Sequence, residues 1–139
     1  MVLVDTSAWI EVFRKPSRLT LEAVVDFEEV VTCLPIVQEV LQGFSSDVAF
    51  RGAREAMLAL PMVESPLGER VYLDAVDLYR RARRAGVTVR SSIDCLVAAC
   101  AIRHGLTVLH NDRDYPAIAR ISELQERQVP LAVSARGSA

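Results

Sequence analysis

Short apolar runs that end close to acidic residues mark the strands of this chain. Residues 1–4 read MVLV and are followed at once by Asp5, and residues 106–109 read LTVL and precede Asp112. Continuous apolar runs of this length are typical of strands that are buried on both faces of a parallel sheet. The segment MVES at 62–65 is a further candidate strand.

Between these runs, apolar residues recur at helical spacing. Thr6 and Ser7 offer capping side chains for a helix that runs to Arg14, before Pro16 ends it. Residues 20–31 also show mostly helical spacing, although the end of this segment is equally consistent with a short strand. Further helices are predicted at 46–60 and, each closed by a glycine at or shortly after its end, at 35–43, 67–84 and 92–104.

The alternation of strands and helices sets the expected fold class. Strands joined through helices imply right-handed crossovers and a sheet that is covered on both faces. We therefore expect a three-layer α/β/α sandwich with a central, mostly parallel sheet. The 139 residues, of which 51% are hydrophobic, fit one compact domain. We place that domain at 1–133 and expect a flexible tail at 134–139.

Composition says more about the cellular compartment of the protein than about its binding partner. The formal net charge of −2 neither demands nor excludes a nucleic-acid partner. Every basic residue except Lys15 is arginine, which favours bidentate recognition of carboxylate or phosphate, although high genomic GC content would produce the same bias. The three cysteines form no metal-binding pair and are expected to be buried free thiols. No secretory signal or membrane span is recognisable, so we expect a cytoplasmic protein.

Four acidic residues fall where a parallel sheet places its ligands. Asp5 ends the first strand, Asp112 follows the strand at 106–109, and Asp94 and Glu39 lie in the early turns of predicted helices. In open α/β sheets, ligands bind beyond the carboxyl ends of the strands. We expect the four carboxylates to share that edge.

Each acid also has a purely structural interpretation. Asp94 and Asp112 could cap helices, where a carboxylate is stabilised by about 0.3 to 1 kcal/mol, and Glu39 could be a solvated helix residue. Asp5 fits this interpretation less well, because an unpaired charge beside a buried strand is strongly disfavoured. As a set, the four would repel one another unless a divalent cation neutralised them. Ligands that are all oxygen suit Mg²⁺ or Mn²⁺.

Four segments carry these acids. They are VLVDTSAWIEVF around Asp5, EVLQG around Glu39, RSSIDCLVAACAIRHG around Asp94 and LTVLHNDRDY around Asp112. In this order and spacing, which spans residues 2–116, the chain resembles the PIN-domain ribonucleases, and among them the VapC toxins of toxin–antitoxin pairs.

The resemblance implies an endoribonuclease that depends on Mg²⁺ or Mn²⁺ and leaves 5′-phosphate and 3′-hydroxyl ends. Its catalytic acids would be Asp5, Glu39, Asp94 and Asp112. The three aspartates would bind the metal, and Glu39 would be a further ligand or would position the attacking water. The family also implies a homodimer and a VapB-type antitoxin whose tail occupies the catalytic groove.

Two further residues match supporting positions of the family. Asp114 matches a recurrent acid that would bind the metal directly, act through water or orient its neighbours. Thr6 matches a hydroxyl residue that would hydrogen-bond a carboxylate or a water in the site.

RNA binding would also require positive charge, since phosphate contacts supply most of the sequence-independent affinity. Arg90 and Arg113 flank the acidic segments and are candidates for contacts with substrate phosphate or with acids of the antitoxin. The cluster RRARR at 80–84 could serve the same purpose or favour the helix dipole. Tyr115 could stack on a base, whereas Trp9 is expected to take part in core or dimer packing.

Other classes fit the sequence less well. A phosphorylated receiver domain would need a lysine near the last strands, and a haloacid-dehalogenase-type phosphatase would need an Asp-x-Asp motif where this chain has DTS. No phosphate-binding P-loop is present. His104 and His110 are the only histidines, too few to support a two-histidine ribonuclease, and we assign them no chemical role. The alternative to an enzyme is a catalytically weak PIN-like domain that binds protein or RNA.

Overall fold

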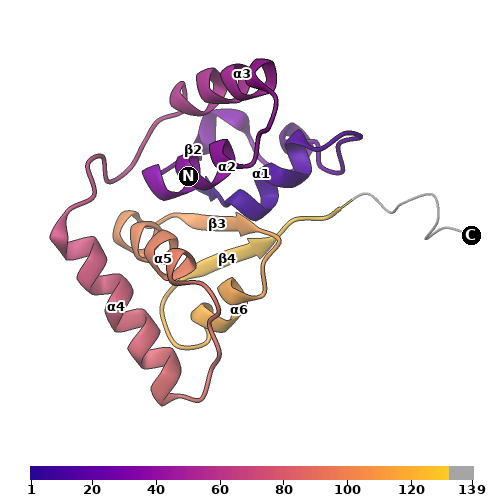
Figure 1. Ribbon diagram of the computed structural model, residues 1–139. Helices are drawn as coiled ribbons and strands as arrows, with labels where there is room; N and C mark the ends of the chain where they lie inside the picture. The colour runs from indigo at the N-terminus through magenta and orange to yellow at the C-terminus, as the bar shows by residue number, and fades with distance from the viewer. Residues whose placement is uncertain (132–139) are drawn as a thin grey trace, which may run out of the picture.

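A parallel four-stranded sheet forms the centre of the protein, whose computed structural model describes residues 1–131 (Figure 1). The strands lie in the order β2-β1-β3-β4, and all pair in parallel. Their bounds are β1 Val2–Val4, β2 Val30–Val31, β3 Thr107–His110 and β4 Gln125–Gln128. The predicted fold class is confirmed.

Strand β1 is central because its side chains are apolar on both faces. All three of its residues are buried, and it pairs Val2 with Val30 on one side and Val4 with Leu109 on the other. The pairing continues past the strand end, where the amide of Asp5 donates to the carbonyl of Leu109 over 2.9 Å. The first acid is thus fixed to the sheet by its own backbone.

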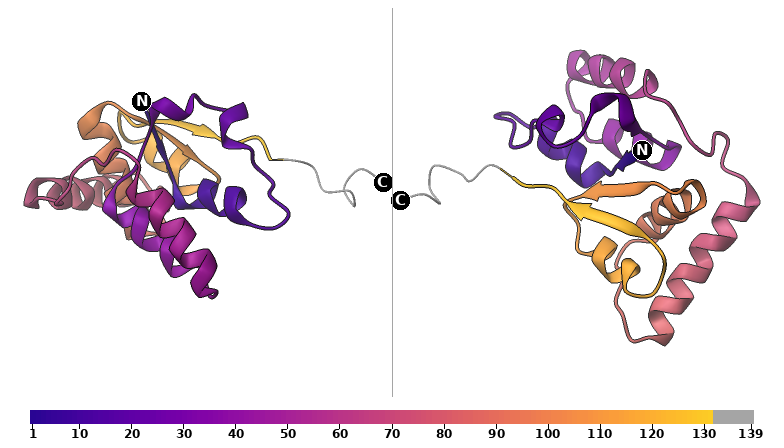
Figure 2. Two further views of the ribbon diagram at one scale, coloured as in Figure 1. Left: turned by 90° about the horizontal axis from the view of Figure 1, so that it is seen from above. Right: turned by 180° about the vertical axis from the view of Figure 1, so that it is seen from behind.

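Within the part of the chain that the structure describes, six α-helices flank the sheet. They are α1 Thr6–Phe13, α2 Leu34–Gln42, α3 Asp47–Leu58, α4 Glu69–Arg84, α5 Ser92–His104 and α6 Asp114–Ala119. Figure 1 shows α1 to α3 in the upper half of the molecule and α4 to α6 in the lower half, with the sheet between them, and the rear view in Figure 2 shows the same division. The first five helices were predicted from spacing. Within residues 1–131, none of the helices has the length and apolarity that crossing a membrane requires.

Helix α5 is the innermost helix. Every residue from Asp94 to Ala101 is buried, and the helix packs against α4, α2 and β3. It ends where Gly105 adopts φ of 64°, a left-handed conformation that L side chains rarely adopt. The predicted glycine end of this helix is therefore confirmed.

Two predicted elements are wrong. The segment 20–31 is not a helix: it forms two short 3-10 turns, η1 Leu21–Ala23 and η2 Phe27–Glu29, and then β2, which confirms the alternative of a short strand at its end. The side chain of Asp26 accepts a hydrogen bond from the amide of Glu28 and starts the second turn, which interrupts any helix. The segment 62–65 is not a strand of the sheet, because only Met62 forms a bridge, with Thr32.

Helix α6 and strand β4 are present although no prediction covered them. Strand β4 is polar and mostly exposed, so its sequence carries no apolar run. Helix α6 contains Pro116, which sits in its first turn, where the missing amide hydrogen costs nothing. The predicted domain end at Val133 and the predicted flexible tail at 134–139 lie outside the described residues.

Candidate metal centre

Three of the predicted acids meet at the carboxyl edge of the sheet. Asp5 follows β1, Asp94 lies in the first turn of α5, and Asp112 follows β3. One carboxylate oxygen from each lies within 4.8 Å of the other two. Asp5 is 2% exposed and Asp94 is 4% exposed, whereas Asp112 is half-buried. The topology predicted that four acids would meet at this edge; the structure brings these three together and leaves the fourth, Glu39, outside the group.

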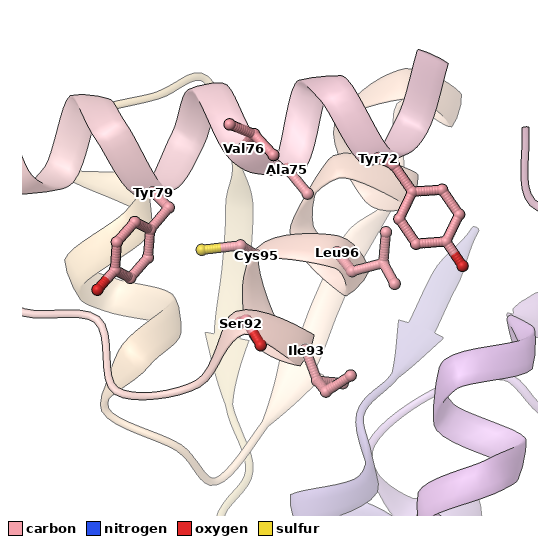
Figure 3. A pocket seen from close by; sticks show the side chains of 8 residues that line it. All are labelled: Tyr72, Ala75, Val76, Tyr79, Ser92, Ile93, Cys95 and Leu96. Atoms are coloured by element: carbon pink, nitrogen blue, oxygen red, sulfur yellow. The ribbon is translucent and has the colours of Figure 1, made fainter. Parts of the chain in front are cut away.

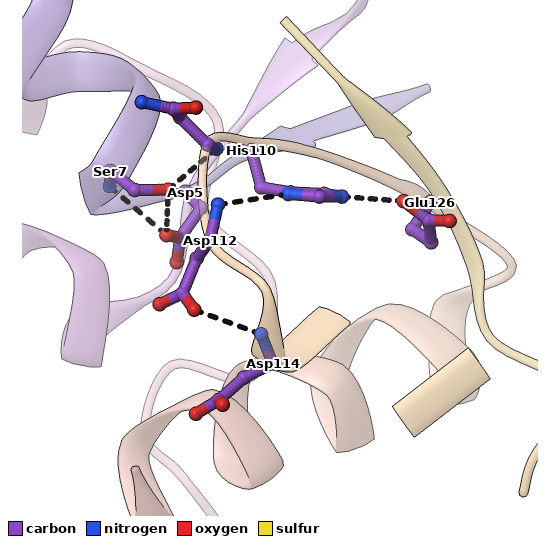
Figure 4. Close-up of polar contacts among 7 residues, drawn as sticks. Asp5, Ser7, His110, Asp112, Asp114 and Glu126 are labelled. Carbon is purple, nitrogen blue, oxygen red and sulfur yellow. Dashed lines mark hydrogen bonds and ion pairs between the residues drawn. The ribbon is translucent and has the colours of Figure 1, made fainter. Parts of the chain in front are cut away.

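Asp5 is held by the start of α1. Its Oδ2 accepts hydrogen bonds from the amide of Ser7 over 3.0 Å and from the Ser7 hydroxyl over 2.6 Å. The same hydroxyl accepts from the amide of Asn111 over 2.8 Å, which ties the end of β3 to α1 (Figure 4). Asp5 is therefore the N-cap of α1, and the predicted capping by Thr6 or Ser7 is wrong.

Asp112 is held from two directions. Its Oδ1 accepts from the amide of Asp114 over 2.9 Å, which is the capping contact that the structural interpretation allowed. Its own amide donates to Nδ1 of His110 over 3.1 Å, and Nε2 of His110 contacts Oε2 of Glu126 over 2.5 Å (Figure 4). Because Nδ1 accepts, the ring hydrogen lies on Nε2 and is donated to Glu126. His110 lies outside the acid cluster but fixes the backbone of one of its members.

Asp114 lies outside the cluster. Its carboxylate accepts from the amides of Arg90, over 3.1 and 3.0 Å, and of Ser91, over 2.9 Å. The side chain is 3% exposed, and both of its carboxylate oxygens accept hydrogen bonds from these amides. Of the roles open to Asp114 in the sequence, the contacts favour orientation of its neighbours, since it fixes the loop that leads into Asp94.

Glu39 lies on α2, beside rather than within the three-acid cluster. Its Oε1 accepts from the hydroxyl of Thr6 over 3.1 Å, which is the supporting contact expected of Thr6. Burial raises the pKa of Glu39, the Thr6 hydrogen bond lowers it, and the charges of Asp5 and Asp112 raise it further. The charges of two clustered acids, Asp5 and Asp112, therefore act on Glu39.

Tyr115 was assigned a base-stacking role that the structure contradicts. Its side chain is fully buried, and its hydroxyl donates to Oδ1 of Asp5 over 2.6 Å and of Asp94 over 3.3 Å. Burial, then the charges of Asp5 and Asp94, raise the pKa of Tyr115. Trp9 is buried and stacks on Phe13, so its predicted core packing is confirmed.

The acids fit a hard divalent cation. Burial, followed by the contact with Asp112 and the charge of Asp5, raises the pKa of Asp94 to about 10. Among residues 1–131, no ion pair neutralises Asp5, Asp94 or Asp112. Oδ2 of Asp94 is buried and has no hydrogen-bond partner in that range. A buried oxygen without a donor, in an all-carboxylate set that forms no ion pair within the described residues, is what Mg²⁺ or Mn²⁺ would satisfy.

Two arginines lie beside the acids and point to solvent. Arg90 precedes α5 and Arg113 precedes α6, and both are exposed. Neither forms an ion pair with another of the described residues. Both guanidinium groups therefore remain available next to the acidic edge.

Three residues that touch the acids had no predicted role in holding them: Ser7, His110 and Tyr115. Each lies within the acidic segments DTS and HNDRDY. A side chain that lies next to a candidate ligand and carries a donor or acceptor is the signal that the sequence offered. Which acid such a side chain contacts across the edge of the sheet could not be predicted from one sequence.

Together, this fold and site define an α/β protein with a candidate cation site of carboxylates at the carboxyl edge of a parallel sheet. A family model described as PIN domain matches residues 2–121, and the chain belongs to the PIN-domain family. Within it the chain belongs with the VapC proteins. It is 40% identical over 132 residues to a VapC ribonuclease of Mycobacterium bovis and to Ribonuclease VapC11 of Mycobacterium tuberculosis, covering 90% of this chain and 96% of each relative.

A solved structure shares the fold at lower identity. VapBC2 from Rickettsia felis, bound to a DNA fragment from its promoter, matches with a TM-score of 0.74. The match has 14% sequence identity and covers 94% of this chain and 100% of the other. At this identity the likeness concerns the arrangement of helices and strands alone.

Proposed function

We propose that this protein is a Mg²⁺- or Mn²⁺-dependent endoribonuclease that acts as the toxin of a toxin–antitoxin pair. The observation that carries the proposal is the convergence of the buried Asp5 and Asp94 with the half-buried Asp112, none of which has an ion-pair partner among residues 1–131. The relatives named VapC ribonucleases, which align over nearly the whole chain, support RNA as the substrate.

In this proposal the role of each acid follows from its position in the site. Asp5, Asp94 and Asp112 hold the cation, and Glu39, set by Thr6, is a further ligand or orients the attacking water. A bound Mg²⁺ or Mn²⁺ would activate water and stabilise charge on the scissile phosphate. Cleavage would leave 5′-phosphate and 3′-hydroxyl ends.

The exposed arginines supply the positive charge that an RNA backbone requires. Arg90 and Arg113 stand at the start of α5 and of α6, next to Asp94 and Asp112, where they would contact the phosphates on either side of the scissile bond. The same two groups would pair with acidic side chains of an antitoxin.

The expected partners are a VapB-type antitoxin and a second copy of the chain. The Rickettsia felis structure is of a VapBC pair, which supports an antitoxin here. For the second copy, α4 offers an exposed apolar stripe of Tyr72, Val76 and Tyr79 over a groove floored by Leu96 (Figure 3). A homodimer through this stripe would cover side chains that are 43% to 54% exposed.

The experiment that tests the proposed function is an RNA cleavage assay with mapped product ends. Wild type should cut RNA in Mg²⁺ or Mn²⁺ and stop in chelator, and Asp94→Asn should stay folded and inactive. Asp77→Asn, which removes a carboxylate that is 63% exposed on α4, is the matched control and should cut normally.

Two results would contradict the proposal. Robust cleavage by Asp94→Asn in chelator would remove the metal from the reaction. Wild type that neither cuts RNA nor binds Mn²⁺ would favour the alternative of a PIN-like binding module. The dimer is tested separately by light scattering, where Val76→Glu should shift the mass to that of one chain.

A further inference from the structure

Tyr115 is the one neutral side chain with hydrogen bonds to two of the three clustered acids among the described residues. It lies in α6, has no exposed surface, and its ring packs 5.0 Å from that of His110. Since it is buried, it cannot reach a substrate. Any effect that it has on the site must pass through the carboxylates.

We propose that the Tyr115 hydroxyl is a positioning group that holds Asp5 and Asp94 at the separation and orientation that cation binding requires. The inference rests on the proposed metal-dependent function. It assigns a role to a residue that neither binds the cation nor contacts RNA.

The division of the oxygens supports this role. On Asp5, Oδ2 accepts two hydrogen bonds from Ser7, and Oδ1 accepts the short bond from Tyr115. On Asp94, Oδ1 faces the same hydroxyl, whereas Oδ2 is buried without a partner. Tyr115 therefore fixes one oxygen of each carboxylate and leaves the second oxygen of Asp94 free for a cation.

The same contact also explains how two buried carboxylates stay close when no cation is bound. A single hydroxyl hydrogen is shared between two oxygens, at 2.6 and 3.3 Å from the phenol oxygen. This shared bond draws both carboxyl groups toward one point. A phenylalanine would fill the same space but remove this link, leaving Asp5 held by Ser7 alone.

The test compares Mn²⁺ binding by wild type, Tyr115→Phe and the control Thr20→Val, which removes a hydroxyl from an exposed side chain away from the acids. Free Mn²⁺ is measured by electron paramagnetic resonance at a temperature where circular dichroism shows all three folded. Loss of an outer partner of metal ligands typically weakens binding by about 10-fold to 100-fold. We expect Tyr115→Phe to bind at least about tenfold more weakly, and Thr20→Val to bind as wild type does.

The outcomes separate this inference from the function on which it rests. A folded Tyr115→Phe variant that binds Mn²⁺ as tightly as wild type, or more tightly, overturns the positioning role alone. Wild type without Mn²⁺ binding overturns the proposed function and this inference with it. If Tyr115→Phe does not fold, the tyrosine difference spectrum of wild type decides: it should change along the Mn²⁺ titration, and an unchanged spectrum overturns the inference.

Discussion

The buried carboxylate of Asp94 predicts an unusual pH dependence of stability in the metal-free protein. Burial raises its pKa from 3.8 to about 10, so the folded protein keeps a proton at neutral pH that the unfolded chain has released. Because the folded state binds more protons, its stability falls as pH rises between these two values. A whole proton lowers the free energy of unfolding by about 1.4 kcal/mol per pH unit.

Asp94→Asn removes this group without changing the shape of the side chain. Between pH 5.5 and 7.5, wild type should lose roughly 3 kcal/mol more than the variant. Urea unfolding in chelator, followed by fluorescence of Trp9, the single tryptophan, measures both slopes. The variant should be the more stable protein at pH 7.5. The control Asp77→Asn, exposed on α4, should keep the wild-type slope.

A divalent cation should reverse this order of stability, so that wild type becomes more stable than Asp94→Asn. At pH 7.5, Mn²⁺ at 100 times its dissociation constant should stabilise wild type by about 2.7 kcal/mol, and should leave Asp94→Asn nearly unchanged. Parallel pH dependences of wild type and Asp94→Asn in chelator would refute the reasoning, because they would show that Asp94 holds no extra proton in the fold.

Three further predictions concern the groups that hold the site. Ser7→Ala removes the hydroxyl that links Asp5 to the amide of Asn111, and should lower the free energy of unfolding by about 1 to 3 kcal/mol in urea titrations. His110→Phe leaves the amide of Asp112 without its acceptor, so calorimetry should show weaker Mn²⁺ binding in a folded protein. Gly105→Ala forces a side chain into φ of 64° and should cost about 1 to 2 kcal/mol, seen as a lower Tm; an unchanged Tm would mean that α5 ends differently.

The elements that the sequence predicted correctly share strong local signals. Strand β1 is a continuous apolar run, and α5 combines an apolar body with a glycine end. The acids followed from the same signals, because parallel strands bring their carboxyl ends to one edge. Asp5, Asp94 and Asp112 could therefore be grouped before any distance was known.

The elements that the sequence missed depend on neighbours. Strand β4 has the sequence QERQ and exists because it pairs with β3 from Thr107 to His110. The segment 20–31 shows helical spacing because Leu21 and Val25 both reach the core, yet Asp26 starts a separate turn. Spacing alone cannot distinguish a helix from two turns that bury the same side chains.

The chemistry of single residues was hardest to predict where it depends on burial. Tyr115 carries an aromatic ring and a hydroxyl, and either can serve in a nucleic-acid site. Only the packing of α6 against α5 and β4 shows that the ring is inside and the hydroxyl faces Asp5 and Asp94. A donor next to an acid in sequence can thus be a support of that acid.

Strand β4 determines how short a functional fragment of this chain can be. The family match ends at residue 121, but Glu126 on β4 receives the His110 hydrogen that leaves Nδ1 free to hold Asp112. A fragment cut at the end of the family match would keep every acid of the site. It would lose the residue that fixes the tautomer of His110, so minimal versions of this protein should extend through the polar edge strand.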